Sequence, residues 1–177
     1  YGSSISQGAG ALDIVNCYIF LTQQALKTDI LNKGLSGSCL LEKSAVDYLA
    51  SIPCKGYILE IGANVRGIMD GPTFEQAFDY LMDTLSKKNC PILLISILDM
   101  FEKLYENFSE VPYHEKNVEF IEIIKKKIIK MNNKNIHLVS SADWMLQIEG
   151  ISADMLHPSN LGHALLANGL TTKIKSL

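Results

Sequence analysis

The sequence predicts an α/β fold, a three-layer α/β/α sandwich around a mostly parallel sheet. Three short apolar segments, partly β-branched, have the character of buried strands, and helical patterns lie between them. Strands that alternate with helices indicate a parallel sheet. Because helices cover both faces of such a sheet, its strands are apolar throughout. The strands are predicted at residues 57–61 (YILEI), 91–97 (PILLISI) and 136–140 (IHLVS), with a weaker one at 29–33 (DILNK).

Five segments repeat apolar residues at the spacing of an α-helix. The second of them repeats Leu41, Ala45, Tyr48 and Leu49 at helical spacing. The last begins with Pro158, which suits a first helical turn because the N–H that proline lacks has no intrahelical partner there. The helices are predicted at 11–27, 39–52, 72–88, 115–131 and 158–175.

Length and composition restrict the class of protein. A chain of 177 residues, 47% hydrophobic and 20% charged, is expected to form one domain with a full core. Its net charge of -3 offers no electrostatic reason for nucleic-acid binding. The lysine run at 125–130 is interpreted as the solvated face of a helix. The longest apolar runs are far too short to span a bilayer.

The four cysteines have no spacing typical of a zinc site, and no other metal-ligand pattern is present. We therefore expect reduced thiols, no metal and no cofactor. Reduced thiols favour a cytoplasmic location, although a secretion signal upstream of Tyr1 stays open.

Four short blocks lie at predicted element boundaries. They are GSS (2–4), NKGLSGS (32–38), LEIGANVRG (59–67) and DMLHPSNLGH (154–163). Each alone has an ordinary structural interpretation: turn serines, a strand-to-helix loop, a turn asparagine and a histidine cap. In parallel sheets, however, ligands bind beyond the carboxyl ends of the strands, which is where such blocks lie.

Taken together and in this order, the four blocks resemble those of the SGNH (GDSL-type) hydrolase superfamily. The resemblance covers residues 1 to about 170 and implies a flavodoxin-like SGNH hydrolase fold. The variant YGSSISQG resembles a subgroup in which a serine replaces the usual aspartate, and in which an extra β-domain often precedes the catalytic one.

The resemblance implies a catalytic triad. Ser4 matches the nucleophile, His157 the general base and Asp154 the acid that orients the base. A serine hydroxyl needs such a base within hydrogen-bond reach, and the base needs a fixed tautomer. Ser3 stands where the family has aspartate, which leaves the hydrogen bonding next to the nucleophile open. His163, further along, is expected to be structural or to support the site.

The resemblance also implies an oxyanion hole. Its donors are the backbone N–H groups of Ser4 and Gly37 and the side-chain amide of Asn64. An amide suits this role because it donates a hydrogen bond without carrying charge. Arg66 is interpreted as a surface residue rather than a substrate contact, and the irregular segment 98–114 is expected to line the site.

A nucleophile in this fold follows a central strand, yet the sequence opens directly on the serine block. We therefore expect residues 1–177 to be a single catalytic domain whose first strand, an apolar one, lies immediately upstream of Tyr1.

The predicted function is a serine esterase that hydrolyses a small acyl ester, an acetyl group on a carbohydrate above all, through an acyl-enzyme. One alternative is acyl transfer to an alcohol by the same acyl-enzyme. Another is a non-catalytic carbohydrate-binding module with a decayed site. The expected partner is a small-molecule or carbohydrate ester, and the oligomeric state stays open.

Overall fold

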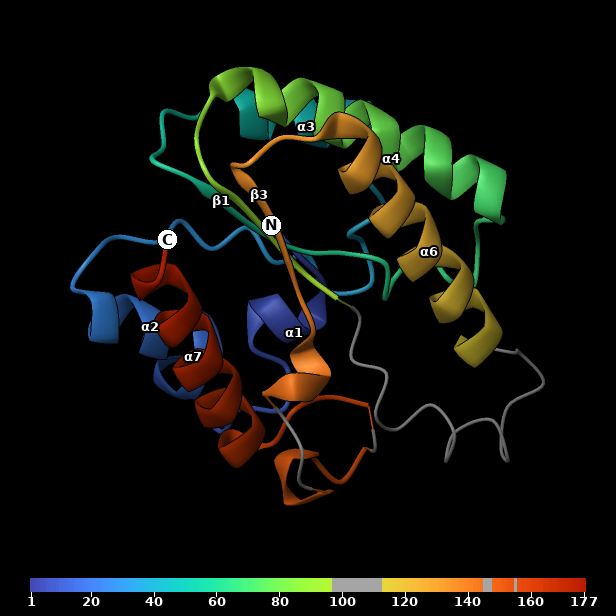
Figure 1. Ribbon diagram of the computed structural model, residues 1–177. Coiled ribbons are helices and arrows are strands. Elements are labelled where there is room, and N and C mark those ends of the chain that lie inside the picture. The colour runs from blue at the N-terminus through green and yellow to red at the C-terminus, as the bar shows by residue number, and fades with distance from the viewer. Residues whose placement is uncertain (97–112, 145–147, 155) are drawn as a thin grey trace.

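A parallel sheet forms the centre of the computed structural model, which describes residues 1–96, 113–144, 148–154 and 156–177 (Figure 1). Its strands are β1 (Tyr57–Glu60), β2 (Ile92–Ile95) and β3 (Ile136–Val139), in that spatial order. Tyr57 is in register with Ile92, which in turn is in register with Ile136. The three strands predicted from the apolar runs are therefore confirmed, as is the parallel α/β architecture.

Helices cover both faces of the sheet (Figure 1). On one face lie α3 (Lys43–Ser51), α4 (Gly71–Leu85) and α6 (Tyr113–Met131). On the other lie α2 (Tyr18–Leu26) and α7 (Asn160–Lys175), which pack against each other. The short α1 (Ser4–Gln7) follows the N-terminus, and 3₁₀ turns occupy Ile14–Asn16, Ser86–Lys88, Ser141–Asp143 and Ile148–Gly150.

The two faces of each strand pack into different core clusters. In β2, Ile92 and Leu94 contact the cluster under α3, α4 and α6, whereas Leu93 and Ile95 contact the cluster under α2 and α7. Side chains of a strand alternate between faces, so a strand covered on both sides must be apolar at every position. This explains the unbroken run at 92–95, all of which is buried.

Two helices begin later than predicted. Residues 11–27 form a 3₁₀ turn, an extended Cys17 and then α2, because the Tyr18 N–H is bonded to the ring of His163 rather than within a helix. Residues 39–42 are not helical either. Leu41 has a left-handed backbone (φ 59°), and its N–H donates to the hydroxyl of Tyr1 at 3.3 Å. Tertiary contacts override helical spacing in both places.

Two further predictions are wrong. Residues 29–33 form no strand; only the next residue, Gly34, makes a single bridge, to Gly2. Pro158 does not open the last helix. It pairs with Ile151 in an isolated bridge, and Ser159 caps α7 through a hydrogen bond from the Gly162 N–H. The helices predicted at 72–88 and 115–131 are confirmed as α4 with the turn that follows it and as α6.

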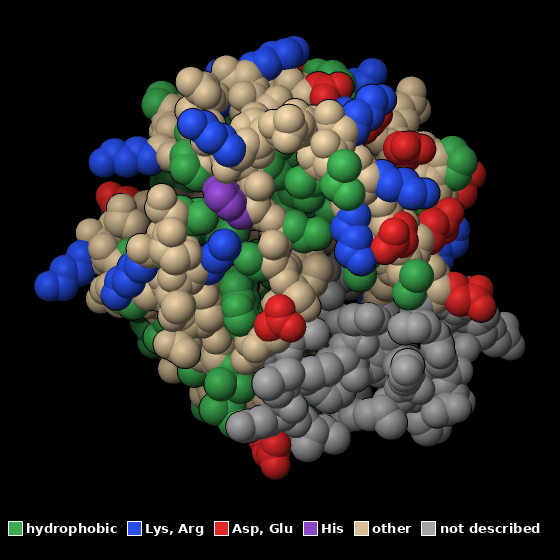
Figure 2. Space-filling view, viewed as in Figure 1, with side chains coloured by type: hydrophobic (Ala, Val, Ile, Leu, Met, Phe, Trp, Pro, Cys, Tyr) green, Lys and Arg blue, Asp and Glu red, His purple; other side chains and the backbone are tan. Residues whose placement is uncertain are grey.

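Acidic and basic side chains intermingle on the face shown in Figure 2. Lys127, from the lysine run, lies 2.9 Å from Asp79 and 2.8 Å from Asp83 on α4. The Lys127 side chain is only 11% exposed, whereas Lys125 of the same run is 51% exposed and lies 2.9 Å from Glu122. These pairings with acidic side chains argue against a basic patch. Among the described residues, no helix is long and apolar enough to cross a membrane. The irregular segment expected to line the site, 98–114, falls almost entirely outside the described residues.

Candidate active site

Ser4 lies at the carboxyl end of β1. Gly2 bridges Glu60, the last residue of that strand, and α1 begins two residues later with Ser4. Ser3 caps this helix: its hydroxyl accepts a hydrogen bond from the Ile5 N–H at 3.2 Å. The turn from strand-like backbone into a capped helix holds the Ser4 side chain at the edge where parallel sheets bind ligands.

The loop before α7 brings His157 to Ser4. The Ser152 N–H donates to the His157 carbonyl at 2.8 Å, and Ser159 then caps the helix, so both ends of the loop are held. The Oγ of Ser4 lies 2.8 Å from Nε2 of His157, although 153 positions separate the two residues. Nδ1 of His157 lies 2.6 Å from Oδ2 of Asp154.

These contacts determine which ring nitrogen carries the proton. An ionised carboxylate only accepts hydrogen bonds, so Nδ1–H of His157 donates to Asp154. In the neutral ring Nε2 is then the acceptor, and the hydroxyl of Ser4 donates to it. A histidine in this tautomer can remove the serine proton, which is the arrangement of an activated nucleophile.

Asp154 is held by four hydrogen bonds. Its Oδ1 accepts from the Ser152 hydroxyl at 2.6 Å and from the N–H groups of Leu156 and His157 at 2.9 Å each, while Oδ2 faces the His157 ring. Burial by itself raises the pKa of Asp154, but these hydrogen bonds outweigh it and hold the pKa well below its usual value of 3.8. The carboxylate therefore stays charged at neutral pH and its orientation is fixed.

Gly10 packs directly against the histidine loop. Its backbone is left-handed (φ 88°), and a Cβ there would lie 2.1 Å from the carbonyl oxygen of Pro158 and 3.0 Å from Cβ of His157. Only glycine combines that backbone with so close an approach. This residue of the opening stretch thus sets how near the histidine loop comes to the serine helix.

Two of the predicted oxyanion donors lie on loops that the structure holds in place. The amide oxygen of Asn64 accepts from the Cys39 N–H at 3.1 Å, which leaves its NH₂ group as the available donor. Gly37, with φ 67°, sits in the turn after the bridge between Gly34 and Gly2, and a Cβ on it would meet no atom within 4 Å. The neighbouring Ser36 N–H donates to the side chain of Gln7 on α1 at 2.8 Å.

A buried carboxylate, Glu60, supports the segment that carries Ser4. Its Oε2 accepts from the N–H of Ser3 at 2.8 Å, from the Ser3 hydroxyl at 2.7 Å and from the Ser6 hydroxyl at 3.1 Å. Burial raises the pKa of Glu60, and the hydrogen bonds from Ser3 and Ser6 oppose that rise. Ser3, which stands where the family has aspartate, can donate to this carboxylate, whereas an ionised aspartate could not.

His163 is structural. It is fully buried, its Nδ1 accepts from the Tyr18 N–H at 3.2 Å, and its Nε2 donates to the Ala9 carbonyl at 3.0 Å. Because a backbone N–H can only donate, the ring is the neutral Nε2–H tautomer. Burial lowers the pKa of His163. This ring ties α7 to α2 and to the turn after α1, and so holds the histidine loop against the serine segment.

The structure brings Ser4, His157 and Asp154 into one chain of hydrogen bonds and leaves the predicted donors on adjacent loops. Sequence analysis missed two supporting residues, Glu60 and Ser152. Glu60 could have been found, because it is a charged residue inside the otherwise apolar strand YILEI. No local sequence pattern pointed to Ser152. Within the described ranges, no three His, Cys, Asp or Glu side chains cluster in a way that could hold a metal ion.

Known proteins that resemble the chain point to one family. The sequence matches the profile of the GDSL-like lipase/acylhydrolase family over residues 1–175. No curated protein sequence matches it. Among solved structures, a GDSL-like lipase candidate from Bacteroides ovatus superposes with a TM-score of 0.82 at 25% identity, covering 99% of this chain and 51% of that one. The chain thus spans about half the length of that protein.

Two other solved structures share the fold at lower identity. A salicylyl-acyltransferase from a tetracycline biosynthetic pathway has a TM-score of 0.76 at 15% identity, covering 99% of this chain and 54% of its own. A two-domain esterase active on acetylated mannans has a TM-score of 0.67 at 21% identity, covering 99% and 47% respectively. Both superpositions cover 99% of this chain.

Proposed function

The chain belongs to the GDSL-like lipase/acylhydrolase family, and from this premise we propose that it is a serine esterase acting on small acyl esters, acetylated carbohydrates above all. Ser4 is the nucleophile, His157 the general base and Asp154 the residue that orients the base. The observation that carries the proposal is the continuous chain of hydrogen bonds among these three side chains, 2.8 Å and then 2.6 Å long.

The reaction begins with attack on the ester carbonyl. As the Oγ of Ser4 bonds to the carbonyl carbon, its proton passes to Nε2 of His157, which is already within hydrogen-bond distance. The imidazolium that forms keeps its Nδ1–H on Asp154, whose carboxylate stabilises the positive charge. The low pKa of Asp154 matters here, because a protonated carboxyl would not provide that stabilisation.

Attack also places a negative charge on the former carbonyl oxygen. In the proposed mechanism the NH₂ group of Asn64 and the N–H groups of Gly37 and Ser4 donate to this oxyanion. A single donor of this kind is typically worth about 3–4 kcal/mol of transition-state stabilisation. His157 then gives its proton to the leaving alcohol, and water, activated by the same ring, releases the acid from Ser4.

The proposed substrate class comes from one neighbour. The two-domain esterase active on acetylated mannans shares this fold across 99% of the chain. An acetyl ester on a sugar also fits the chemistry of the triad, since it needs only an activated serine and donors for the oxyanion.

Acyl transfer is a second candidate, favoured by the fold shared with the salicylyl-acyltransferase. The acyl-enzyme on Ser4 is common to both reactions, and the acceptor decides between them. A water acceptor gives hydrolysis, whereas a bound alcohol gives a new ester. A non-catalytic module with a decayed site is disfavoured, because the three triad side chains are chemically competent and hydrogen-bonded to one another.

The first experiment tests the nucleophile. Ser4→Ala should abolish hydrolysis of p-nitrophenyl acetate and labelling by a fluorophosphonate probe, with circular dichroism unchanged. Ser6→Ala is the matched control: it lies on the same helical turn, but its hydroxyl faces Tyr18 and Glu60 rather than His157. Equal rates and equal labelling in wild type and Ser4→Ala would refute the proposal.

A second experiment tests which acyl ester is hydrolysed and whether water or an alcohol accepts the acyl group. Acetate release from acetylated manno-oligosaccharides, compared with p-nitrophenyl esters of longer acids, tests the preference for acetyl groups. Adding a deacetylated oligosaccharide as acceptor and analysing the products by mass spectrometry tests for transfer. Products acetylated at new positions, formed faster than free acetate, favour the acyltransferase.

A further inference from the structure

The turn that carries Gly37 projects from the fold with few contacts. Residues 35–38 form a four-residue turn, closed by a hydrogen bond from the Ser38 N–H to the Leu35 carbonyl at 3.1 Å, and all four residues are exposed. Gly37 takes the third position with the left-handed backbone (φ 67°) that glycine adopts there without strain. Within the part of the chain that the structure describes, no group accepts a hydrogen bond from the Gly37 N–H. This N–H can therefore bind a substrate oxygen, provided that the turn is held in place.

Both ends of the turn are attached to neighbouring segments of the site. At its start, the Leu35 N–H donates to the Gly2 carbonyl at 2.8 Å. Just beyond its end, the Cys39 N–H donates to the amide oxygen of Asn64 at 3.1 Å. These two hydrogen bonds fix where the turn begins and ends, and its tip is held by a third contact.

The side chain of Gln7 holds the tip of the turn. Its Oε1 accepts a hydrogen bond from the Ser36 N–H at 2.8 Å. Among the described residues, this is the one hydrogen bond that connects residues 36–38 with another segment. Gln7 ends the short helix α1 that Ser4 begins. Because helical residues three positions apart lie on the same side, Gln7 reaches the turn from the side of α1 that carries the nucleophile.

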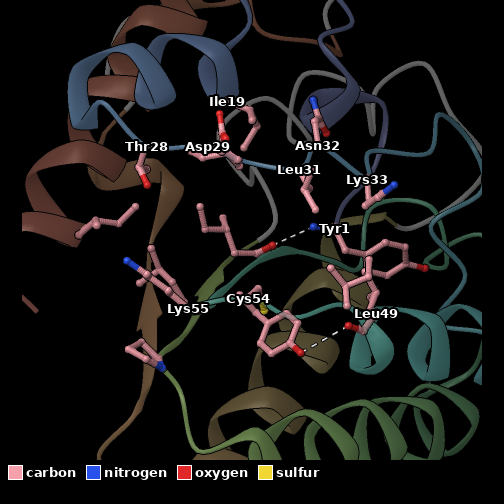
Figure 3. Close-up of a pocket in the computed structure, with 18 of the residues that line it drawn as sticks. Tyr1, Ile19, Thr28, Asp29, Leu31, Asn32, Lys33, Leu49, Cys54 and Lys55 are labelled. Carbon is pink, nitrogen blue, oxygen red and sulfur yellow. Dashed lines mark hydrogen bonds between the residues drawn. The ribbon is translucent and has the colours of Figure 1, made fainter.

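The backbone just before the turn packs directly on α1. A Cβ on Gly34 would lie 2.7 Å from Cα of Gln7 and 2.7 Å from the carbonyl carbon of Ser6, so only glycine permits this approach. Nδ2 of Asn32 donates to the Ser6 carbonyl at 2.7 Å, and its Oδ1 accepts from the Gly34 N–H at 2.9 Å. Figure 3 shows the Asn32 side chain pointing toward α1, opposite to that of Leu31. The base of the turn is therefore fixed on the same helix whose last residue holds the tip.

We propose, on the basis of the esterase function proposed above, that Gln7 is a positioning residue for the oxyanion hole. By accepting from the Ser36 N–H, it holds the peptide group next to the one that carries the Gly37 N–H. That N–H then meets the oxygen of the carbonyl group that Ser4 attacks. Gln7 itself touches neither the substrate nor the reacting atoms. Because Gln7 and Ser4 belong to one helical turn, the separation of the attacking oxygen and the oxyanion donor is set within a single unit.

Removing one acceptor atom tests the role of Gln7. Gln7→Met keeps the length of the side chain and lacks the oxygen that accepts from the Ser36 N–H. Because Gln7 is exposed and water can accept from the released N–H, the urea midpoint of unfolding should stay at the wild-type value. The kcat for p-nitrophenyl acetate should fall about 10- to 100-fold with KM unchanged, because the donor acts only in the transition state. A wild-type kcat in Gln7→Met overturns the proposal.

Gln23→Met is the matched control. Oε1 of Gln23 also accepts from a backbone N–H, that of Ile30 at 3.2 Å, but Gln23 lies on α2 and makes no hydrogen bond to the turn. This variant should keep the wild-type kcat. If Gln7→Met and Gln23→Met lower kcat equally, the effect is not specific to the oxyanion turn and the proposal fails.

Two further readouts separate positioning from a general structural effect. A trifluoromethyl ketone forms a tetrahedral adduct on Ser4 whose oxygen uses the same donors, so Gln7→Met should raise its inhibition constant by the factor by which kcat/KM falls. The Ser36 amide should exchange with deuterated water faster in Gln7→Met than in the wild type, whereas Gln7→Glu, which keeps an acceptor oxygen, should exchange at the wild-type rate. An unchanged inhibition constant, or equal exchange in the three proteins, overturns the proposal.

The esterase proposal and the role of Gln7 fail in different ways. If Ser4→Ala hydrolyses p-nitrophenyl acetate as fast as the wild type, the esterase proposal fails and the role of Gln7 falls with it. If hydrolysis requires Ser4 and Gln7→Met keeps its full kcat, only the role of Gln7 is refuted.

Discussion

Gly10 offers the sharpest test of how the triad is held together. Alanine at this position places a Cβ 2.1 Å from the Pro158 carbonyl oxygen, and an ordinary contact begins at 3.4 Å, so one of the two segments must move by 1.3 Å. Pro158 follows His157 directly, and the Ser4–His157 hydrogen bond is 2.8 Å long. A displacement above 1 Å takes that pair beyond hydrogen-bond distance.

Gly10→Ala is expected to lower both the catalytic activity and the stability of the fold. Misplacement of a catalytic group by about 1 Å lowers kcat by about 100-fold. The left-handed backbone adds roughly 1–2 kcal/mol of destabilisation once a Cβ is present. At about 2–4 °C per kcal/mol for a chain of this size, Tm should fall by several degrees.

Gly8→Ala is the matched control. Gly8 is also left-handed (φ 112°), but a Cβ there meets the side chain of Cys17 at 3.0 Å and not the histidine loop. Both variants should lose stability, and only Gly10→Ala should lose most of its kcat in the p-nitrophenyl acetate assay. If the two variants have the same kcat, contact at Gly10 does not position His157 and the reasoning fails.

Three further predictions follow from the same contacts. Asn64→Ala should lower kcat about 10²–10³-fold with little change in KM, as expected for a donor used only in the transition state, and steady-state kinetics would expose an error if KM rose instead. Ser3→Asp puts a second carboxylate beside Glu60, so urea unfolding should show a loss of stability that is larger at pH 8 than at pH 5, and a pH-independent loss would contradict charge repulsion. Because burial lowers the pKa of His163, the folded state binds fewer protons than the unfolded state near the ordinary pKa of 6.5. The free energy of unfolding should therefore be highest above pH 6.5 and fall as the pH drops below it. His163→Gln should remove this fall, as measured by denaturation at pH values from about 7.5 to about 5.5.

The buried strands were predictable because their apolar composition is the one that their position in the fold requires. The run ILLI is apolar at every position, which only a strand covered on both faces requires. Residues 29–33 (DILNK), of which only Ile30 and Leu31 are apolar, form no strand. A strand is defined by its pairing with a neighbour, and here only the next residue, Gly34, pairs, in a single bridge to Gly2. Composition alone does not report whether a segment finds a strand to pair with.

Helix starts were the least predictable elements. Leu41 fits the helical spacing of 39–52, but its N–H bonds to the hydroxyl of Tyr1 and its backbone is left-handed. Tyr18 similarly directs its N–H to the ring of His163. In both cases a partner distant in sequence satisfies a backbone donor that a local pattern assigns to the helix.

The amino-acid sequence by itself determined the layer architecture and the chemical identity of the groups at the site, because periodicity and residue type are local properties. Only the tertiary structure decided that Ser4 and His157 meet at 2.8 Å, that Glu60 takes the Ser3 hydrogen bonds, and that Gly10 brings the two loops together. Such contacts form between residues that are far apart in the chain and are brought together by the packing of helices and strands. A local sequence pattern therefore does not encode the distance between them.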